Sequence, residues 1–349
     1  IDSEVFPSSG RSGRRDSVDE MREKKGHEAR SGSFELKVKD KGDKDGRRPN
    51  KSPNPSLAAD PVFAQLPRLK EASPAEQGEL LCRKLKECCT VYDFRRDDFP
   101  LEKEGKRLTL LEIVEHASSP KGGAFSAERC VGDAVGMAGA NIFRTLSKRE
   151  RFALDLLDPE GDEAFLEPAW PHLELVYELL QRLVTNKDLD SGAVAKFVTK
   201  AFLERLFELF DSDDSRERDC LKQLLKVIYS KFTPLRSSIR RAIQNICVRA
   251  THDPDNVLNG IGELLDIMSR VINGFSTPLK EDNQEIFLQV LIPMHKIGWI
   301  HLFHPSLVDC VKKFVEKDSK LTYHVVRALL RFWPLSCGTK QILFLSELE

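Results

Sequence analysis

The feature that most constrains the fold is a repeated helical pattern of apolar residues, which begins near Val62 and continues to the end of the chain. Apolar side chains recur every three or four residues, the spacing that places them on one face of an α-helix. The clearest stripes are Leu81–Tyr92, Leu166–Val184, Leu221–Phe232, Leu235–Ile246, Ile261–Ile272, Leu307–Val315 and Leu321–Phe332. No segment alternates as a half-buried β-strand does, so the pattern predicts an all-α fold.

Short turns rich in helix-capping residues separate these stripes, for example "DSDDS" at 211–215 and "HPSL" at 304–307. Helices of about 15 residues joined in this way pair into units of roughly 40 residues, the period of HEAT-type repeats. We therefore predict an α-solenoid of HEAT-like helical hairpins over residues 61–349. A compact helical bundle is the alternative, because the units share little sequence identity with one another.

Residues 1–60 differ in composition from the rest of the chain. They are rich in Ser, Gly, Pro and charged residues, and Phe6 and Phe34 are their only aromatics. Because so little apolar surface does not offset the entropy cost of folding, we predict a disordered, charged leader. A solvated linker fits the interleaved charges better than a basic import tail. The start at Ile1 indicates a fragment or a processed form.

Charge and cysteine usage narrow the class of protein. The net charge of −1 means that the whole molecule does not attract nucleic acid, and any attraction must come from a local patch. Eight cysteines occur without CxxC or CxxH spacing, so we expect them to be reduced and buried, as in a cytoplasmic or nuclear protein. No apolar run is long enough for a membrane span.

No motif in the sequence points to catalysis, a metal or a cofactor. Phosphate-binding loops, nucleophile elbows and zinc-hydrolase pairs are absent. The segment "DSDDS" resembles the start of a calcium loop, but Arg216 stands where Gly is needed and Lys222 where Glu is needed, so a helix N-cap is expected. The spacing of His301 and His304 could suit a metal, yet Pro305 places His304 at a helix start and His301 in the preceding turn.

The segment from Cys220 to His252 contains no Asp or Glu, although 33 residues of this chain would carry about five on average. The basic residues of this acid-free strip therefore lack the usual helical partners. A solvated helix face is the ordinary interpretation. If the two helices are adjacent, however, their basic and aromatic side chains form a groove beside an apolar floor. The residues in question are Lys226, Tyr229, Arg236 and Arg240.

Such a groove suits a short peptide with apolar and acidic or phosphorylated positions, because Arg binds carboxylates and phosphates through paired hydrogen bonds. RNA is the other candidate ligand. It would require basic and stacking side chains that repeat from unit to unit, and the chain has only 4 Tyr and 3 Trp. The sequence therefore favours a peptide and predicts no nucleic-acid partner.

Several ordered segments resemble one known family. They include "LPRLKEASPAEQGELLCRKLKECCTVYDF", "DPEGDEAFLEPAWPHLELVYELL", "LFDSDDSRERDCLKQLLKVIYSKF", "VINGFSTPLKEDN" and "LLRFWP". From about Leu66 to the last residue the chain is similar to the B-prime (fifty-six kilodalton) family of protein phosphatase 2A regulatory subunits. Residues 1–60 carry no such resemblance.

The resemblance implies a superhelix that performs no chemistry itself. Members of this family join the scaffold subunit and the catalytic subunit of the phosphatase, and recruit substrate proteins through short motifs of the LxxIxE type. A helical-repeat adaptor that binds cargo peptides without any phosphatase is the second interpretation. The family continues beyond the final "FLSELE", so we expect a chain truncated at its C-terminal end.

The resemblance also implies which residues bind the motif. Tyr229 and Arg236 match the family's groove tyrosine and arginine, and Ile267 and Val271 stand where it has two isoleucines. The segment "KVIY" departs from the family's His-Arg-Ile-Tyr pattern, because Lys226 replaces the histidine and Val227 the arginine. Loss of that arginine removes a two-pronged donor for phosphorylated positions. The predicted motif-binding residues are Lys226, Tyr229, Arg236, Arg240, Ile267 and Val271.

Overall fold

The structure, a computed structural model, describes Phe63, residues 66–118, Phe125, and residues 128–146, 165–187, 189, 191–253 and 255–349. The chain divides into two units, Ile1–Pro55 and Ser56–Glu349, and every described residue belongs to the second. The predicted leader therefore lies outside the described residues.

The described residues are helical, and none of them forms a strand, which confirms the all-α prediction. The helices are α1 (Pro74–Glu87), α2 (Pro100–Ala117), α3 (Glu128–Ile142), α4 (Trp170–Thr185), α5 (Ser191–Phe197), α6 (Lys200–Glu208), α7 (Ser215–Lys231), α8 (Arg236–His252), α9 (Ile261–Asn273), α10 (Glu281–Ile286), α11 (Ile292–Met294), α12 (His304–Lys317), α13 (Thr322–Arg331) and α14 (Gly338–Leu348). A π-helical turn, Phe287–Leu291, joins α10 to α11.

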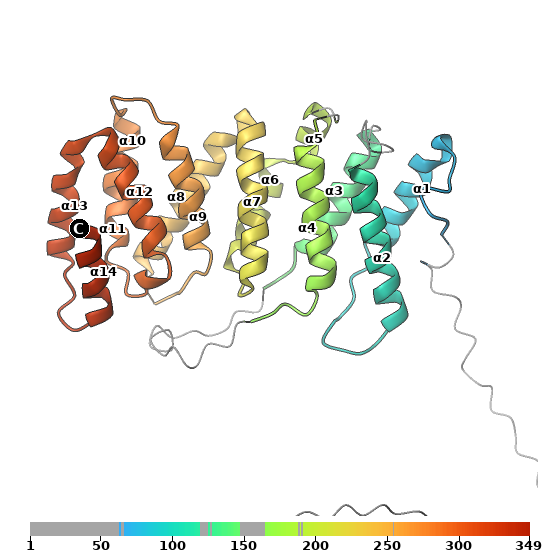
Figure 1. Cartoon of the computed structure of the whole chain (residues 1–349), viewed down its shortest axis with the longest axis horizontal. Coiled ribbons are helices and arrows are strands. Elements are labelled where there is room, and N and C mark those ends of the chain that lie inside the picture. The colour runs from blue at the N-terminus through green and yellow to red at the C-terminus, as the bar shows by residue number, and fades with distance from the viewer. Residues whose placement is uncertain are drawn as a thin grey trace, which may run out of the picture. The chain divides into compact units, whose positions relative to one another are not determined.

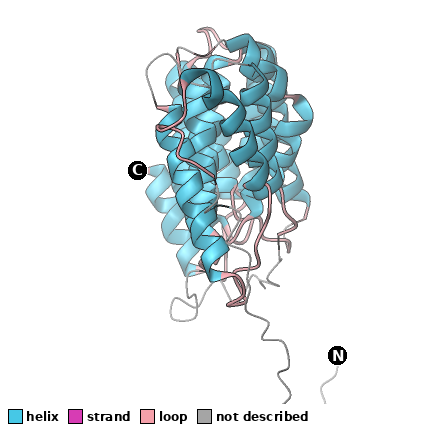
Figure 2. Ribbon diagram, turned by 90° about the vertical axis from the view of Figure 1, so that its right-hand side faces the viewer, coloured by secondary structure: helices cyan, strands magenta, loops and turns pink. Residues whose placement is uncertain are grey.

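The helices of the second unit stack in two layers. In one layer α2 packs on α4, α4 on α7, α7 on α9 and α9 on α12, and in the other α1 packs on α3, α6 on α8 and α8 on α11. Figure 1 shows this order along the unit, and Figure 2 shows the layers from its end. Each helix thus contacts mainly the next helices of its own layer, which lie only one to three places away along the chain, the arrangement of a solenoid of helical hairpins, as predicted.

The apolar stripes form the core between the layers. On α7, for example, Leu221, Leu224, Leu225 and Ile228 are all buried. Truncation of one such leucine to alanine costs roughly 2–5 kcal/mol of stability. Contacts of this kind hold α9 against both α7 and α8.

Two residues assigned to apolar stripes are exposed, and both lie outside the helices. Leu166 is exposed because α4 begins only at Trp170, with Pro171 in its first turn. Cys89 is exposed because α1 ends at Glu87, so the helical spacing no longer applies to it. The prediction that all cysteines are buried is therefore wrong for Cys89.

The "DSDDS" segment caps a helix, as expected. The Asp214 carboxylate accepts a hydrogen bond of 2.9 Å from the backbone N–H of Arg216, in the first turn of α7. This bond satisfies a donor that the helix itself leaves unpaired.

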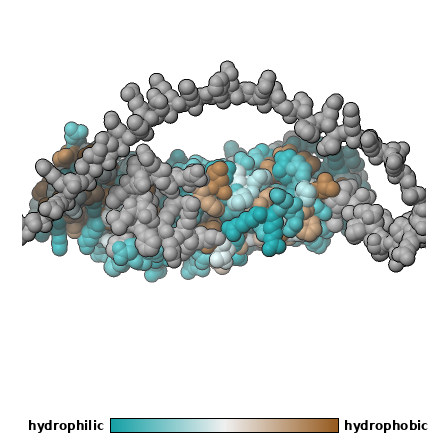
Figure 3. Space-filling view, turned by 90° about the horizontal axis from the view of Figure 1, so that it is seen from below, coloured by the Kyte–Doolittle hydropathy of each residue, from teal (hydrophilic) through white to brown (hydrophobic). Residues whose placement is uncertain are grey.

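No described helix is long and apolar enough to cross a membrane. Seen from below, the described surface mixes hydrophilic and hydrophobic residues (Figure 3).

Candidate peptide-binding groove

An open groove lies where the C-terminal halves of α7 and α9 meet the start of α8. All six residues that the sequence predicts for motif binding line it. Its volume of about 790 Å³ is within the usual range for ligand sites. The lining residues are Lys226, Tyr229, Ser230, Arg236, Arg240, Ile267, Arg270, Val271, Asn273, Gly274, Phe275 and Lys313.

Helical spacing explains why these side chains converge. Residues three or four apart share one face of a helix, as Lys226 and Tyr229 do on α7, and Arg236 and Arg240 on α8. A short 3₁₀ turn, Thr233–Leu235, folds α8 back beside α7. Since α9 packs against both helices, the basic faces of α7 and α8 meet at its surface.

The apolar floor is more enclosed than expected. Ile267 and Val271 line the groove, but only 1% and 4% of their surfaces are exposed. Tyr229 and Phe275 are half-buried and also line it. A peptide side chain entering the groove therefore meets these two rings first, and gains little new contact with Ile267 unless the rings move.

Arg236 is largely occupied by the backbone of α7. Its Nε donates to the Tyr229 carbonyl at 2.8 Å, and one terminal nitrogen, Nη2, donates to the Ser230 carbonyl at 3.0 Å. These carbonyls belong to the last turn of α7, where helix geometry leaves acceptors unpaired. The other terminal nitrogen, Nη1, makes no hydrogen bond to a described residue, so its N–H groups remain for a ligand.

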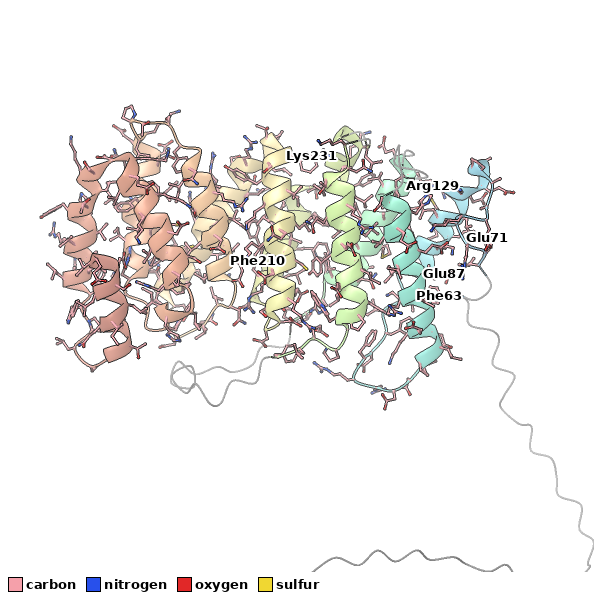
Figure 4. The ribbon with its side chains drawn as sticks, viewed as in Figure 1. Phe63, Glu71, Glu87, Arg129, Phe210 and Lys231 are labelled. Carbon is pink, nitrogen blue, oxygen red and sulfur yellow. The ribbon has the colours of Figure 1, made fainter. Side chains whose placement is uncertain are left out.

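Basic side chains cap the C-terminal ends of the helices in this layer. Arg182 of α4, Lys231 of α7 (Figure 4) and Lys317 of α12 each donate to backbone carbonyls at the end of the preceding helix of the layer, α2, α4 and α9 respectively. At the junction of α7 with α9 the pattern changes. There Arg236 of α8 caps α7, and Arg270 of α9 is left facing the groove.

Three groove cations therefore lack a carboxylate. Lys226, Arg240 and Arg270 form no ion pair within the described ranges. Partial burial lowers the pKa of Lys226, and the charges of Arg270 and Lys222 lower it further. Burial is the main cause of this shift, and repulsion between nearby cations is the second.

The groove as a whole is positively charged. Of the residues that line it, all of them described, five are Lys or Arg and none is Asp or Glu. Among these five basic residues, only Lys313 has a described carboxylate partner: its Nζ donates a hydrogen bond of 2.6 Å to Asp309. An anionic ligand would therefore meet unneutralised charge in this groove.

Some basic residues of the acid-free strip do have acidic or carbonyl partners. Lys222 forms ion pairs with Asp219, just before the strip, and with Asp266 of α9. Lys231 and Arg236 are occupied by carbonyls. The expectation of unneutralised charge along the whole strip is therefore wrong, since acidic and carbonyl partners come from neighbouring elements.

Sequence reasoning missed Arg270 and Lys313. Arg270 follows Ile267 by three residues on α9, so helical spacing alone could have placed it on the groove face. Val227, where the resembled family has arginine, packs against the core and does not line the groove. A guanidinium is thus present in the groove, but it comes from α9 instead of α7.

One of the two candidate metal residues, His304, has another role. His304 begins α12, and its Nε2 lies 3.0 Å from Glu347 Oε2, while Glu347 Oε1 lies 3.1 Å from His295 Nε2. Burial alone would raise the pKa of Glu347, but hydrogen bonds from the two histidines bring it to about 2. No described group of three or more side chains is arranged to hold a metal ion.

Comparison with known proteins agrees with the family resemblance seen in the sequence. The family model of the protein phosphatase 2A regulatory B subunit (B56 family) matches residues 66–349. The mouse and human serine/threonine-protein phosphatase 2A 56 kDa regulatory subunit alpha isoforms are each 44% identical over 285 residues, which are 81% of this chain and 57% of theirs.

A plant relative is similar to the same extent. The theta isoform of the 57 kDa B' regulatory subunit of serine/threonine protein phosphatase 2A from Arabidopsis thaliana is 43% identical over 290 residues, 82% of this chain and 58% of its own. The chain thus spans under two thirds of the length of the relatives it matches. Because the family model covers most of this chain at matching positions, the chain belongs to the B56 family of protein phosphatase 2A regulatory B subunits.

Proposed function

We propose that this chain is a non-catalytic regulatory subunit of protein phosphatase 2A, which joins the scaffold and catalytic subunits and recruits substrates through LxxIxE-type motifs. Its relatives are named as regulatory subunits of this phosphatase, which supports the first part. The groove between α7, α8 and α9 supports the second.

The observation that carries the motif proposal is the convergence of six predicted residues in one positively charged groove. An extended peptide of six residues spans about 20 Å, since each residue adds about 3.3 Å. The apolar positions of the motif would contact Tyr229, Phe275 and the floor beneath them. Its glutamate would then lie against the cations at the rim, where burial of part of the pair strengthens the attraction.

Two cations are best placed to bind the motif's glutamate. Arg240 and Arg270 both line the groove and carry no described ion-pair partner. Arg270 also provides the two-pronged donor that Val227 cannot, from the opposite wall. Acidic motifs should therefore bind although the family's arginine is absent from α7.

A pull-down with purified scaffold and catalytic subunits tests the regulatory role. The expected result is a stoichiometric complex of three chains, and an Arg240→Glu variant should assemble equally well, since we assign the groove to the substrate motif and not to the other subunits. A cargo adaptor would bring down neither subunit. That result from a folded chain would overturn the regulatory assignment, but it would leave peptide binding by the groove to be judged separately.

A further inference from the structure

Two cysteines from different helices meet at the packing contact between α1 and α3. Cys82 lies on α1 and Cys130 on α3, and their sulfur atoms are 3.4 Å apart. Only 6% and 2% of these residues are exposed. Figure 4 labels the neighbours Glu87, at the end of α1, and Arg129, next to Cys130. All described cysteines are free thiols in this structure.

The two sulfurs are in non-bonded contact. A disulfide holds its sulfurs about 2.05 Å apart, so these two must approach by about 1.4 Å. The Cys130 thiol also contacts the carbonyl of Gly78, one turn before Cys82 on the same face of α1. The two helices therefore already meet at this point, and a small rotation of the side chains or a small shift of α1 would close the gap.

Local chemistry determines how readily the pair reacts. Burial raises the pKa of Cys82 to about 12, and the neighbouring Asp133 and Cys130 contribute to the same rise. Little of the reactive thiolate form of Cys82 is therefore present while α1 packs against α3. Asp133 lies one turn after Cys130, and its buried Oδ2 is 4.0 Å from the Nε of Arg129.

Exposure of the pair depends on α1. This helix is the first one described, and its main contacts are with α2 and α3. Helices at the end of a stack open locally at a lower cost than central ones. Brief opening of α1 would expose Cys82 to solvent and to an oxidant, and closure would return it to contact with Cys130.

We propose that Cys82 and Cys130 are a disulfide-forming pair, and that a two-electron oxidant joins them and fastens α1 to α3. With hydrogen peroxide, one thiolate attacks an oxygen of the peroxide and becomes a sulfenic acid, and the hydroxide that leaves takes a proton to form water. The second thiol attacks the sulfenic sulfur, forms the S–S bond and releases a second water. Two thiols and one peroxide thus give one disulfide and two waters.

The burial that slows oxidation also protects the product. A disulfide at this contact would be shielded from attack by external thiols once α1 closes. It would cross-link residues 48 apart in sequence, and so restrict the open states of the first helices. The modification is therefore slow to form and slow to reverse.

Peroxide treatment of the full chain tests the proposal. The free thiols are then alkylated in denaturant, and the chain is digested without reductant and mapped by mass spectrometry. A linked peptide containing Cys82 and Cys130, lighter by two hydrogens than its parts, is the expected product. Exposed Cys89 provides an internal check that the oxidant has reacted.

A matched set of variants separates the link from other effects. Cys82→Ser and Cys130→Ser should each abolish it, while Cys89→Ser should leave it intact. In the oxidised wild type, amide exchange in α1 should slow on the order of tenfold or more, and reductant should restore it. The proposal is overturned if Cys89 is fully oxidised while Cys82 and Cys130 stay alkylatable, or if either forms its link with another cysteine.

Discussion

The guanidinium of Arg236 lies over the ring of Tyr229, with Cζ 5.4 Å from the ring centroid, while its Nε donates to the Tyr229 carbonyl at 2.8 Å. The Arg236 side chain thereby caps the C-terminal end of α7. It also contacts the ring of Tyr229, which lines the groove. Arg236 consequently acts on a ligand in two ways, through its free Nη1 and through the position that it imposes on Tyr229.

Substitution of Arg236 should affect both stability and binding. Arg236→Ala should lower the free energy of unfolding by about 1–2 kcal/mol, since it removes two hydrogen bonds to carbonyls and a cation–π contact. Arg236→Glu should in addition abolish binding of an LxxIxE peptide, because it places a negative charge beside the motif's glutamate. Urea unfolding and fluorescence polarisation measure the two effects. Full peptide affinity in a folded Arg236→Glu chain would contradict this role.

Arg240 and its neighbour Arg241 form a matched pair for charge reversal. Arg240 lines the groove, whereas Arg241 is exposed and lines a different surface beside Lys200 and Glu204. Arg240→Glu should weaken peptide binding at least tenfold, on the order of the energy of one charge-assisted contact. Arg241→Glu changes the net charge equally and should leave affinity within about twofold. Equal losses in the two variants would show that only the overall charge matters.

Arg270 tests whether the cation of α9 replaces the family's arginine of α7. Arg270→Ser should weaken binding of an LxxIxE peptide roughly fivefold to tenfold and reduce its dependence on salt, since one exposed cation is lost. Val227→Arg should not restore binding, because Val227 packs against the core and an arginine there is destabilising. Titrations at two salt concentrations provide the measurement. An unchanged affinity in Arg270→Ser would remove Arg270 from the site.

Glu347 should make the stability of the C-terminal helices dependent on pH. Its pKa of about 2 in the folded state is below the ordinary value of 4.5, because His295 and His304 hold the carboxylate. A depressed pKa contributes stability that is present above about 4.5 and is lost as the pH falls toward 2. Glu347→Gln should therefore lower the free energy of unfolding by roughly 2–3 kcal/mol at pH 7 and by much less near pH 2.5.

Denaturant unfolding of the wild type and Glu347→Gln at the two pH values checks this expectation. If the two proteins differ in their free energy of unfolding by as much at pH 2.5 as at pH 7, the charge of the Glu347 carboxylate contributes nothing to stability.

Local spacing predicted the helices well, and it failed where a helix ends. The stripes on α7, α8 and α9 follow directly from apolar residues three and four apart. Leu166 and Cys89 were misplaced because periodicity does not show where a capping residue or a proline sets the boundary.

The candidate site was predictable in its residues and less so in its electrostatics. Family resemblance identified residues such as Tyr229 and Ile267, which the structure brings into one groove. Sequence spacing could not show that Asp266 would reach Lys222, or that Arg236 would turn to the carbonyls of α7, since both depend on how separate helices pack. Arg270, by contrast, was within reach of sequence spacing, since it follows Ile267 by three residues on α9.

Fluorescence polarisation with the unmodified chain tests the central claim most directly. A labelled LxxIxE peptide is titrated beside a copy in which lysine replaces the motif's glutamate, with circular dichroism to verify the helical fold. The account predicts saturable binding of the first peptide and none of the second, because the groove contains five cations and no carboxylate. Failure of the folded chain to bind the first peptide, or equal binding of the two, would contradict it.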